Sequence, residues 1–339
     1  MRSGIIAGGN WIVDHVKLID AWPPQDALAS ILSQSWGNGG SPYNLLKNLA
    51  RMGATFSREA IGLVGDDASG RIIQEDCRAH GIDLTQLRVT SAAPTSYTDV
   101  MTEVTTRRRT FFHQRGANAV LSPEHFDFSA TNAKLFHLGY LLLLDGLDAL
   151  GADGMPRAAE VFRRARQAGL VTSADCVSEH GDRFTSVVAP LLPEIDLLFA
   201  NDFEAEKITG LTLGRGATLD ARGLEAAGEA LLQRGVREWV IIHLPEGVFA
   251  CSARGEKVWQ GSVAMPPSEI AGTAGAGDAL ATGVIFGWHE GWSMQRSLEL
   301  GVCTAAASLR HSTCSDAVGS LAECRAMGER LGFRTFPVA

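Results

Sequence analysis

Short apolar runs alternate with amphipathic segments along almost the whole chain. The apolar runs have the length of buried β-strands, and the clearest of them cover residues 4–8, 135–138, 170–174, 196–200 and 239–243. Between these runs, the spacing of apolar positions predicts helices over residues 43–52, 66–80, 156–168, 220–234, 278–288 and 293–310. This alternation is typical of an α/β protein with a mostly parallel central sheet.

Glycine follows several of the amphipathic segments directly. We expect four predicted helices to end at a left-handed residue, a conformation that glycine adopts without steric cost. These glycines are Gly53, Gly81, Gly169 and Gly235.

Two segments do not follow the alternation of strands and helices. Residues 11–38 are rich in strand-forming side chains before the Pro23-Pro24 break, and residues 96–113 alternate with a period of two. We predict that strands from both places pair into a small sheet, which is either a lid over a site or an extension of the main sheet. Because no internal repeat or linker divides the chain, we expect one domain over residues 1–339, with lid segments at about 11–38 and 95–115.

The composition is that of an ordinary globular protein and excludes several classes. Of 339 residues, 45% are hydrophobic and 20% are charged, and the net charge is −8. The chain is acidic, and its one tight basic run is Arg107–Arg109, which we interpret as a solvated face of the lid. This charge distribution argues against nucleic acid as a partner. Six scattered cysteines and the lack of a long apolar stretch argue against a disulfide framework and a membrane span, so a cytoplasmic location is expected.

Residues 271–288, AGTAGAGDALATGVIFGW, join a glycine-rich loop to a predicted helix. The backbone amides of Gly275, Ala276 and Gly277 would converge at the helix N-terminus and favour an anion there. Asp278 follows in the first turn, where an aspartate can cap the helix or act as a general base beside a bound phosphate. The sequence contains no Gly-Lys dipeptide, no third glycine of a dinucleotide fingerprint, no H-E-x-x-H and no G-x-S-x-G, which excludes the commonest alternatives.

Four short motifs, in the order and spacing of the family, resemble those of the pfkB, or ribokinase-like, family of carbohydrate kinases. The D-T-T-G-A-G-D signature of the family is matched over its last four positions, and a G-G-x-x-x-N element and an N-x-x-E element are matched as well. A strand-end glycine pair and a substrate-binding aspartate have counterparts near the amino terminus. The matching residues are Gly8, Gly9, Asp14, Gly39, Gly40, Asn44, Asn201, Glu204, Gly275, Ala276, Gly277 and Asp278.

The resemblance implies a ribokinase-like fold with a mostly parallel sheet flanked by helices and a small β-rich lid. It also implies transfer of the γ-phosphoryl group of ATP to a hydroxyl of a sugar or related small polyol. Asp278 would then be the general base, and the amides of Gly275, Ala276 and Gly277 the anion hole. The acceptor would be held by Asp14, Gly39, Gly40 and Asn44, whereas Arg115 would either reach the substrate or the phosphates or be a surface arginine.

The resemblance also implies a nucleotide and metal site. Asn201, Thr273 and Gly247 would contact ATP, and Glu204 would hold Mg²⁺ through water, although Asn201 and Glu204 are equally typical of a helix capping box. Gly272 replaces the aspartate that helps relatives to hold a monovalent cation, so potassium activation is in doubt. Pro245 departs from the glycine-rich turn of relatives, which puts the nucleotide site in doubt.

The family resemblance leaves the acceptor and the degree of activity open. A nucleoside kinase of the same family is one alternative, and a catalytically weak sugar- or nucleotide-binding regulatory homologue is the other. Relatives frequently pair through their lids, so the resemblance also implies a homodimer.

Overall fold

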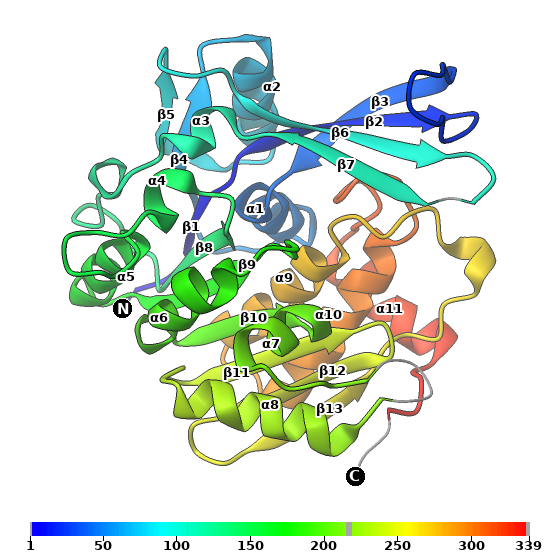
Figure 1. Cartoon of the computed structure of the whole chain (residues 1–339). Helices are drawn as coiled ribbons and strands as arrows, with labels where there is room; N and C mark the ends of the chain where they lie inside the picture. Colours follow the sequence, from blue (N-terminus) through cyan, green and yellow to red (C-terminus); the bar gives the residue numbers. More distant parts are fainter. Residues whose placement is uncertain (1, 107, 215–218, 337–339) are drawn as a thin grey trace.

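The computed structural model describes residues 2–106, 108–214 and 219–336, which build a nine-stranded sheet and a separate four-stranded sheet (Figure 1). Seven strands of the large sheet run parallel, and a hairpin adds two antiparallel strands at one edge. In spatial order the strands are β13 (Lys257–Gly261), β12 (Gly247–Ser252), β11 (Trp239–Leu244), β10 (Leu197–Asn201), β9 (Val171–Cys176), β8 (Leu135–Leu141), β1 (Ile5–Gly9), β4 (Arg58–Gly65) and β5 (Asp83–Thr90).

Helices cover both faces of the large sheet and enclose two hydrophobic cores. Alternation along β1 shows how the cores are separated, because Ile6 packs into one core while Ile5 and Ala7 pack into the other. The first core is closed by α3 (Gly116–Ala119), α4 (Asp145–Asp148), α5 (Ala158–Gln167), α6 (Ala189–Leu191), α7 (Asp202–Thr209) and α8 (Ala221–Gln233). The second is closed by α1 (Ser41–Arg51), α2 (Ala68–Ala79), α9 (Ala276–His289), α10 (Met294–Ser308) and α11 (Leu321–Leu331).

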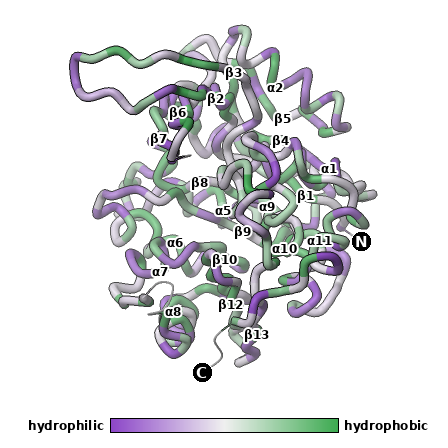
Figure 2. Tube along the Cα trace, turned by 90° about the vertical axis from the view of Figure 1, so that its right-hand side faces the viewer, coloured by the Kyte–Doolittle hydropathy of each residue, from purple (hydrophilic) through white to green (hydrophobic). Residues whose placement is uncertain are grey.

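The small sheet combines the two segments that the period-two pattern singled out. Its order is β3-β2-β6-β7, with β2 antiparallel to β3 and parallel to β6. The small sheet projects from the main body, and its β2–β3 end extends away from the rest of the molecule (Figures 1 and 2). The predicted pairing of the two segments is therefore confirmed. The strands are β2 (Ile12–Ile19), β3 (Ile31–Gly39), β6 (Ser96–Glu103) and β7 (Arg109–Gln114).

The predicted α/β class and all five predicted core strands are confirmed, with boundaries that differ by one to three residues. The four glycines expected after helices all have positive φ, from 64° to 117°. The pattern missed β4, β5, β12, β13 and α11. Two of these strands, β5 and β13, lie at the edges of the sheet with few fully buried side chains, which weakens their apolar signal. The strands β4 and β12 are interior and largely buried, so edge exposure does not explain why they were missed. Within the described residues, no helix is long and apolar enough to cross a membrane.

Candidate active site

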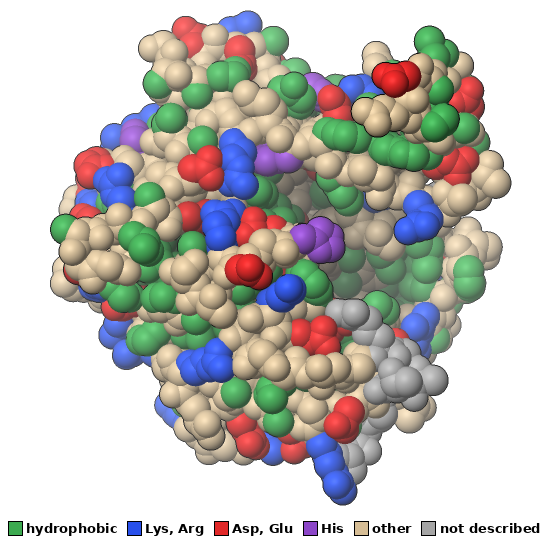
Figure 3. Space-filling view, viewed as in Figure 1, with side chains coloured by type: hydrophobic (Ala, Val, Ile, Leu, Met, Phe, Trp, Pro, Cys, Tyr) green, Lys and Arg blue, Asp and Glu red, His purple; other side chains and the backbone are tan. Residues whose placement is uncertain are grey.

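A cavity of about 540 Å³ opens beneath the small sheet, where it faces the carboxyl ends of β8, β9 and β10 and the N-terminus of α9 (Figure 3). The carboxyl end of a parallel sheet is the common place for a ligand site, because successive loops converge there. Most of the side chains and glycines singled out from the sequence line this cavity. They are Asp14, Gly40, Asn44, Arg115, Asn201, Glu204, Thr273, Gly275, Ala276, Gly277 and Asp278.

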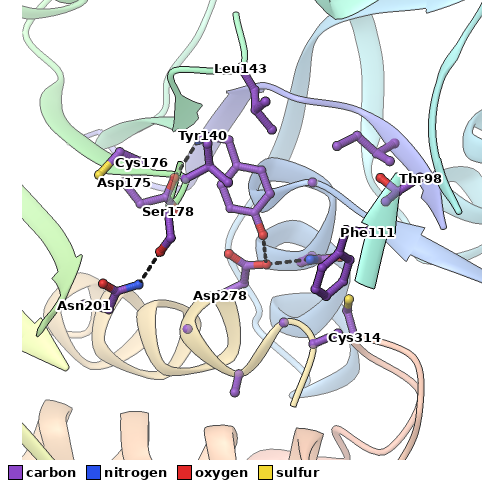
Figure 4. A pocket seen from close by; sticks show the side chains of 18 of the residues that line it. Thr98, Phe111, Tyr140, Leu143, Asp175, Cys176, Ser178, Asn201, Asp278 and Cys314 are labelled. Carbon is purple, nitrogen blue, oxygen red and sulfur yellow. Dashed lines mark hydrogen bonds between the residues drawn. The ribbon is translucent and has the colours of Figure 1, made fainter. Parts of the chain in front are cut away.

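Asp278 lies in the first turn of α9 with its carboxylate at the centre of the cavity (Figure 4). Asn44 Nδ2 and the Tyr140 hydroxyl both donate to Asp278 Oδ2, at 2.6 and 2.8 Å. No hydrogen bond from a described residue reaches Oδ1 of this carboxylate. Burial raises the pKa of Asp278 to about 7, and the negative charge of Asp175 adds to the rise.

A second layer of polar groups holds Tyr140 and Asp175 next to Asp278. The backbone N–H of Tyr140 and the hydroxyl of Ser41 donate to the two oxygens of Asp175, each at 2.6 Å. His137 Nε2 lies 2.8 Å from the same Ser41 hydroxyl. Tyr140 has φ 60°, a conformation that costs a non-glycine residue about 1–3 kcal/mol. The hydrogen bonds at both ends of Tyr140 hold it in this unfavourable conformation.

The glycine-rich loop before α9 approaches its neighbours closely. Gly275 caps the helix at φ 73°, and a Cβ there would lie 2.6 Å from Cys314 Cβ. A Cβ on Gly277 would lie 3.1 Å from the His243 ring. The amides of the first turn of α9 have no partner within the helix, and the Ala276 N–H makes a long hydrogen bond of 3.4 Å to the Thr273 carbonyl. These amides can therefore donate to an anion in the cavity.

The acceptor-side residues predicted from the sequence gather around Asp14 on β2. Asp14 is partly exposed to the cavity, and desolvation there raises its pKa to about 7. A Cβ on Gly39 would overlap the Asp14 carboxylate, which explains why a glycine lies beside it although Gly39 itself does not line the cavity. Gly40 has φ 87°, and a Cβ there would overlap the carbonyl of Asn10.

Asn201 and Glu204 form the capping box that was the structural alternative for this motif. Asn201 Oδ1 accepts from the Glu204 N–H at 2.8 Å, and Glu204 Oε2 accepts from the Asn201 N–H at 2.9 Å. The other carboxylate oxygen accepts from the Ser178 hydroxyl at 2.8 Å. Burial raises the pKa of Glu204 to about 7. Both residues nevertheless border the cavity, so capping does not exclude contact with a ligand.

The acidic side chains next to Glu204 do not form a closed metal cage. Among the residues that the structure describes, no three His, Cys, Asp or Glu side chains cluster closely enough to hold an ion by themselves. Mg²⁺ suits such an open set, because it retains several waters and binds through one or two carboxylates together with phosphate oxygens. The donors present therefore fit a metal held mainly by water and phosphate.

Two sequence-predicted positions lie differently from the rest. Gly247 lies in β12 outside the cavity lining, where a Cβ would be 2.5 Å from the Phe336 ring, so its lack of a side chain serves packing. Pro245 lies in the tight turn between β11 and β12, and its carbonyl accepts from the Ser262 hydroxyl at 2.9 Å. Arg115 lines the cavity and is paired with Asp145 at 2.7 Å.

Three side chains of the site were missed from the sequence, although strand ends carried a signal for them. Tyr140, Asp175 and His243 lie at or near the carboxyl ends of β8, β9 and β11 and line the cavity. Polar residues at the ends of neighbouring parallel strands meet at one edge, which would have singled out all three. Burial lowers the pKa of His243 to about 4, so this ring is neutral at physiological pH.

Comparisons with known proteins agree with this geometry. The sequence model that describes the pfkB family of carbohydrate kinases matches residues 9–319 of this chain. The chain is 29% identical over 291 residues to an ATP-dependent ribose-1-phosphate kinase of Halopiger xanaduensis, with 86% of each chain covered. It is 25% identical over 298 residues to a 5-dehydro-2-deoxygluconokinase of Shouchella clausii, again with 86% of each covered.

The structure is also similar to solved structures of the same fold. One is Arabidopsis thaliana ribokinase complexed with ribose and ATP, at a TM-score of 0.78 and 20% identity. The match covers 96% of this chain and 99% of that one. The expected ribokinase-like architecture is therefore confirmed.

Proposed function

The chain belongs to the pfkB family of carbohydrate kinases and is an ATP-dependent sugar kinase, and on that premise we propose that Asp278 is the general base of phosphoryl transfer. The observation that carries the proposal is the position of this buried carboxylate beside the helix N-terminus formed by Gly275, Ala276 and Gly277. A base and an anion-binding loop side by side are what transfer to a hydroxyl requires.

The reaction moves one phosphoryl group and one proton. The acceptor hydroxyl oxygen attacks the γ-phosphorus, and the bond between that phosphorus and the β–γ bridging oxygen breaks, so that ADP leaves with the electron pair. The hydroxyl proton passes to Asp278. Oδ2 of Asp278 already accepts from Asn44 and Tyr140, so Oδ1 is the oxygen proposed to take the proton.

The anion hole acts on the charge of the group in transfer. The amides of Gly275, Ala276 and Gly277, at the positive end of the α9 dipole, would donate to the equatorial phosphoryl oxygens. Small residues are required because the phosphate must approach the backbone. Loss of such donors typically lowers the rate about 10²-fold or more.

ATP is proposed to bind across Thr273 and Asn201, and Mg²⁺ to bind near Glu204 through water. Bound Mg²⁺ would neutralise charge on the phosphates. Asn201 and Glu204 orient each other through the capping box, so the pair presents a fixed carboxamide and a fixed carboxylate to phosphate and to the water around the metal. Gly272 offers no carboxylate to a monovalent cation, so we do not expect potassium to be required.

The acceptor site is proposed to comprise Asp14, Gly40 and Asn44, with Gly39 making room for Asp14. A carboxylate and a carboxamide bind sugar hydroxyls as acceptor and donor. The test is incubation with ATP and a panel of acceptors, with ADP formation and product mass as readouts. The panel comprises ribose, ribose 1-phosphate, 2-deoxyglucose, 5-dehydro-2-deoxygluconate and adenosine. Turnover of a sugar supports the proposal, whereas ADP formation with adenosine alone would assign a nucleoside kinase.

The lid is also proposed to pair with the lid of a second copy. Trp36 and Phe112 on the small sheet and Trp22 in the loop between β2 and β3 are each about half exposed, and Trp22 stacks on Phe112 at 6.0 Å between centroids. Exposed aromatic clusters of this kind mark interaction surfaces. The dimer would be recognised by its mass in light scattering.

A cytoplasmic location is proposed as well, since all six cysteines are free and buried.

A further inference from the structure

We propose that Arg109 and Thr102 of the lid form a subsite for an anionic group, a phosphate or a carboxylate, on the acceptor sugar. This inference rests on the proposed function and narrows its substrate class. It corrects the interpretation of Arg107–Arg109 as a solvated face. Arg107 lies outside the described residues, Arg108 is exposed as expected, and Arg109 is partly buried.

The strand register directs Arg109 toward the cavity. Side chains two apart along a strand lie on the same face, and Phe111 and His113 of β7 both line the cavity. Arg109 is the next residue in that series and lies just beyond the cavity lining, beside Gly272. On β6, Thr98 lines the cavity and Thr102 lies on the same face, directly opposite Arg109 in the antiparallel pairing.

Both members of this cross-strand pair carry an unsatisfied polar atom. Arg109 Nη1 and Thr102 Oγ1 are buried and have no hydrogen-bond partner among the described residues. Thr102 is 8% exposed. Buried polar atoms are rarely left unpaired, so two of them on facing residues indicate a missing ligand. A guanidinium donates only, and a hydroxyl can donate, so the fitting ligand is an acceptor of hydrogen bonds with negative charge.

The absence of a side chain at Gly272 leaves the space that the Arg109 guanidinium occupies. A Cβ on Gly272 would overlap Arg109 Nη2, so any side chain there would displace the arginine. The aspartate that relatives carry at this position would also neutralise the charge. Without it, no described carboxylate lies within ion-pair distance of Arg109. The positive charge therefore remains available to a ligand.

The position of Arg109 relative to Asp14 indicates the acceptor rather than ATP as the ligand. Asp14, on the acceptor side, interacts electrostatically with both Asp278 and Arg109. Asp14 of β2 pairs directly with Thr98 of β6, which lies on the same face of the small sheet as the Thr102–Arg109 pair. An acceptor held by Asp14, with one hydroxyl at Asp278, would thus carry its anionic group toward the lid.

The test compares each anionic acceptor of the panel with its uncharged counterpart in wild type, Arg109→Gln, Arg109→Lys and Thr102→Val. Arg108→Gln is the matched control, because Arg108 is the exposed neighbour. We expect wild type to prefer the anionic acceptor at least 10-fold in kcat/KM. Arg109→Gln should lose about 10- to 100-fold on it, mainly through KM, as expected for a charge-assisted hydrogen bond. In Arg109→Gln, kcat/KM for uncharged acceptors should change less than threefold. Arg109→Lys should retain part of the kcat/KM for the anionic acceptor that Arg109→Gln loses. Thr102→Val should lower kcat/KM for that acceptor less than Arg109→Gln does.

A preference for the sugar phosphate assigns a phosphate subsite, and a preference for the sugar acid assigns a carboxylate subsite. Equal use of charged and uncharged acceptors by wild type would overturn the inference and leave the kinase function intact. An equal loss of kcat on all acceptors in Arg109→Gln would also overturn it, since that result points to the transferred phosphoryl group. If no acceptor turns over, calorimetric binding of the sugar phosphate without ATP decides: weaker binding to Arg109→Gln than to wild type supports the subsite, and equal binding refutes it.

Discussion

The hydroxyl of Tyr140 donates a hydrogen bond of 2.8 Å to Oδ2 of Asp278, and the same tyrosine donates its backbone N–H to Asp175. Tyr140 thus connects two buried carboxylates, and Tyr140 and Asp175 affect the pKa of Asp278 in opposite directions. Its hydroxyl stabilises the ionised form of Asp278, whereas the charge of Asp175 disfavours that form. The balance of the two sets the proton affinity of the proposed base.

Removing the Tyr140 hydroxyl should move the pH dependence of turnover upward. Asp278 acts as a base only when ionised, so activity should fall as the pH drops below its pKa of about 7. In Tyr140→Phe the carboxylate loses a stabilising hydrogen bond, its pKa rises, and the acid limb of kcat/KM should shift up by about one pH unit. An acid limb that stays where it is in wild type would refute a link between this bond and the base.

Neutralising Asp175 should move the same limb in the other direction. Asp175→Asn removes the negative charge that raises the pKa of Asp278, while its amide oxygen can still accept from the Tyr140 N–H. The acid limb of kcat/KM should shift to lower pH. Shifts of the same sign in Tyr140→Phe and Asp175→Asn would show that both act through general disruption of the site.

Adding a methyl group at Gly39 should weaken acceptor binding. The new Cβ would overlap the Asp14 carboxylate and displace it. We expect both Gly39→Ala and Asp14→Asn to raise the KM of the acceptor about 10-fold, with the KM of ATP within twofold of wild type. Steady-state kinetics with each substrate varied in turn measure this. A rise in the KM of ATP alone would show that Asp14 contacts ATP and not the acceptor.

Gly247→Ala should destabilise the fold without changing nucleotide binding. A Cβ there would crowd the Phe336 ring and the Gln260 carbonyl, and overpacking of this kind costs about 1–3 kcal/mol. Denaturant unfolding should show the loss, and Gly223→Ala on helix α8, where a Cβ meets only ordinary contacts, should not. A large rise in the KM of ATP in the folded variant would restore the sequence-based assignment of Gly247 to the nucleotide.

Asp278→Asn should gain stability relative to wild type as the pH rises. The carboxyl has a pKa near 7 in the native state, above its ordinary value of 3.8, so the native state binds this proton more tightly than the unfolded chain does. Its contribution to stability is present below about pH 4 and is lost as the pH rises through 7. An asparagine cannot ionise and avoids that loss. The Tm difference between variant and wild type should be more positive at pH 8 than at pH 5, and a pH-independent difference would contradict it.

The sequence was sufficient for five of the seven parallel strands and for most of the glycine-rich and carboxylate positions, because short motifs and apolar runs leave local signals. The edge strand β5 left none, since half of its side chains face solvent. Tyr140 and Asp175 belong to no motif, and only the pairing of β8 with β9 brings them behind Asp278.

The role of Arg109 could not be read from the basic run either. Its direction depends on the register between β6 and β7 and on the missing side chain at Gly272, which is 163 positions away in the chain. A shift of one residue in that register would have turned Arg109 to the outer face and Arg108 inward. Long-range pairing of this kind has no signature in a single sequence.

The most direct test of the central claim is single-turnover phosphorylation of the panel's best sugar acceptor by Asp278→Asn, with Asp153→Asn, an exposed carboxylate, as control. Loss of a general base should lower the rate about 10³-fold with the KM of ATP nearly unchanged, while the control matches wild type. A rate within threefold of wild type in Asp278→Asn would contradict the assignment of Asp278 as the base.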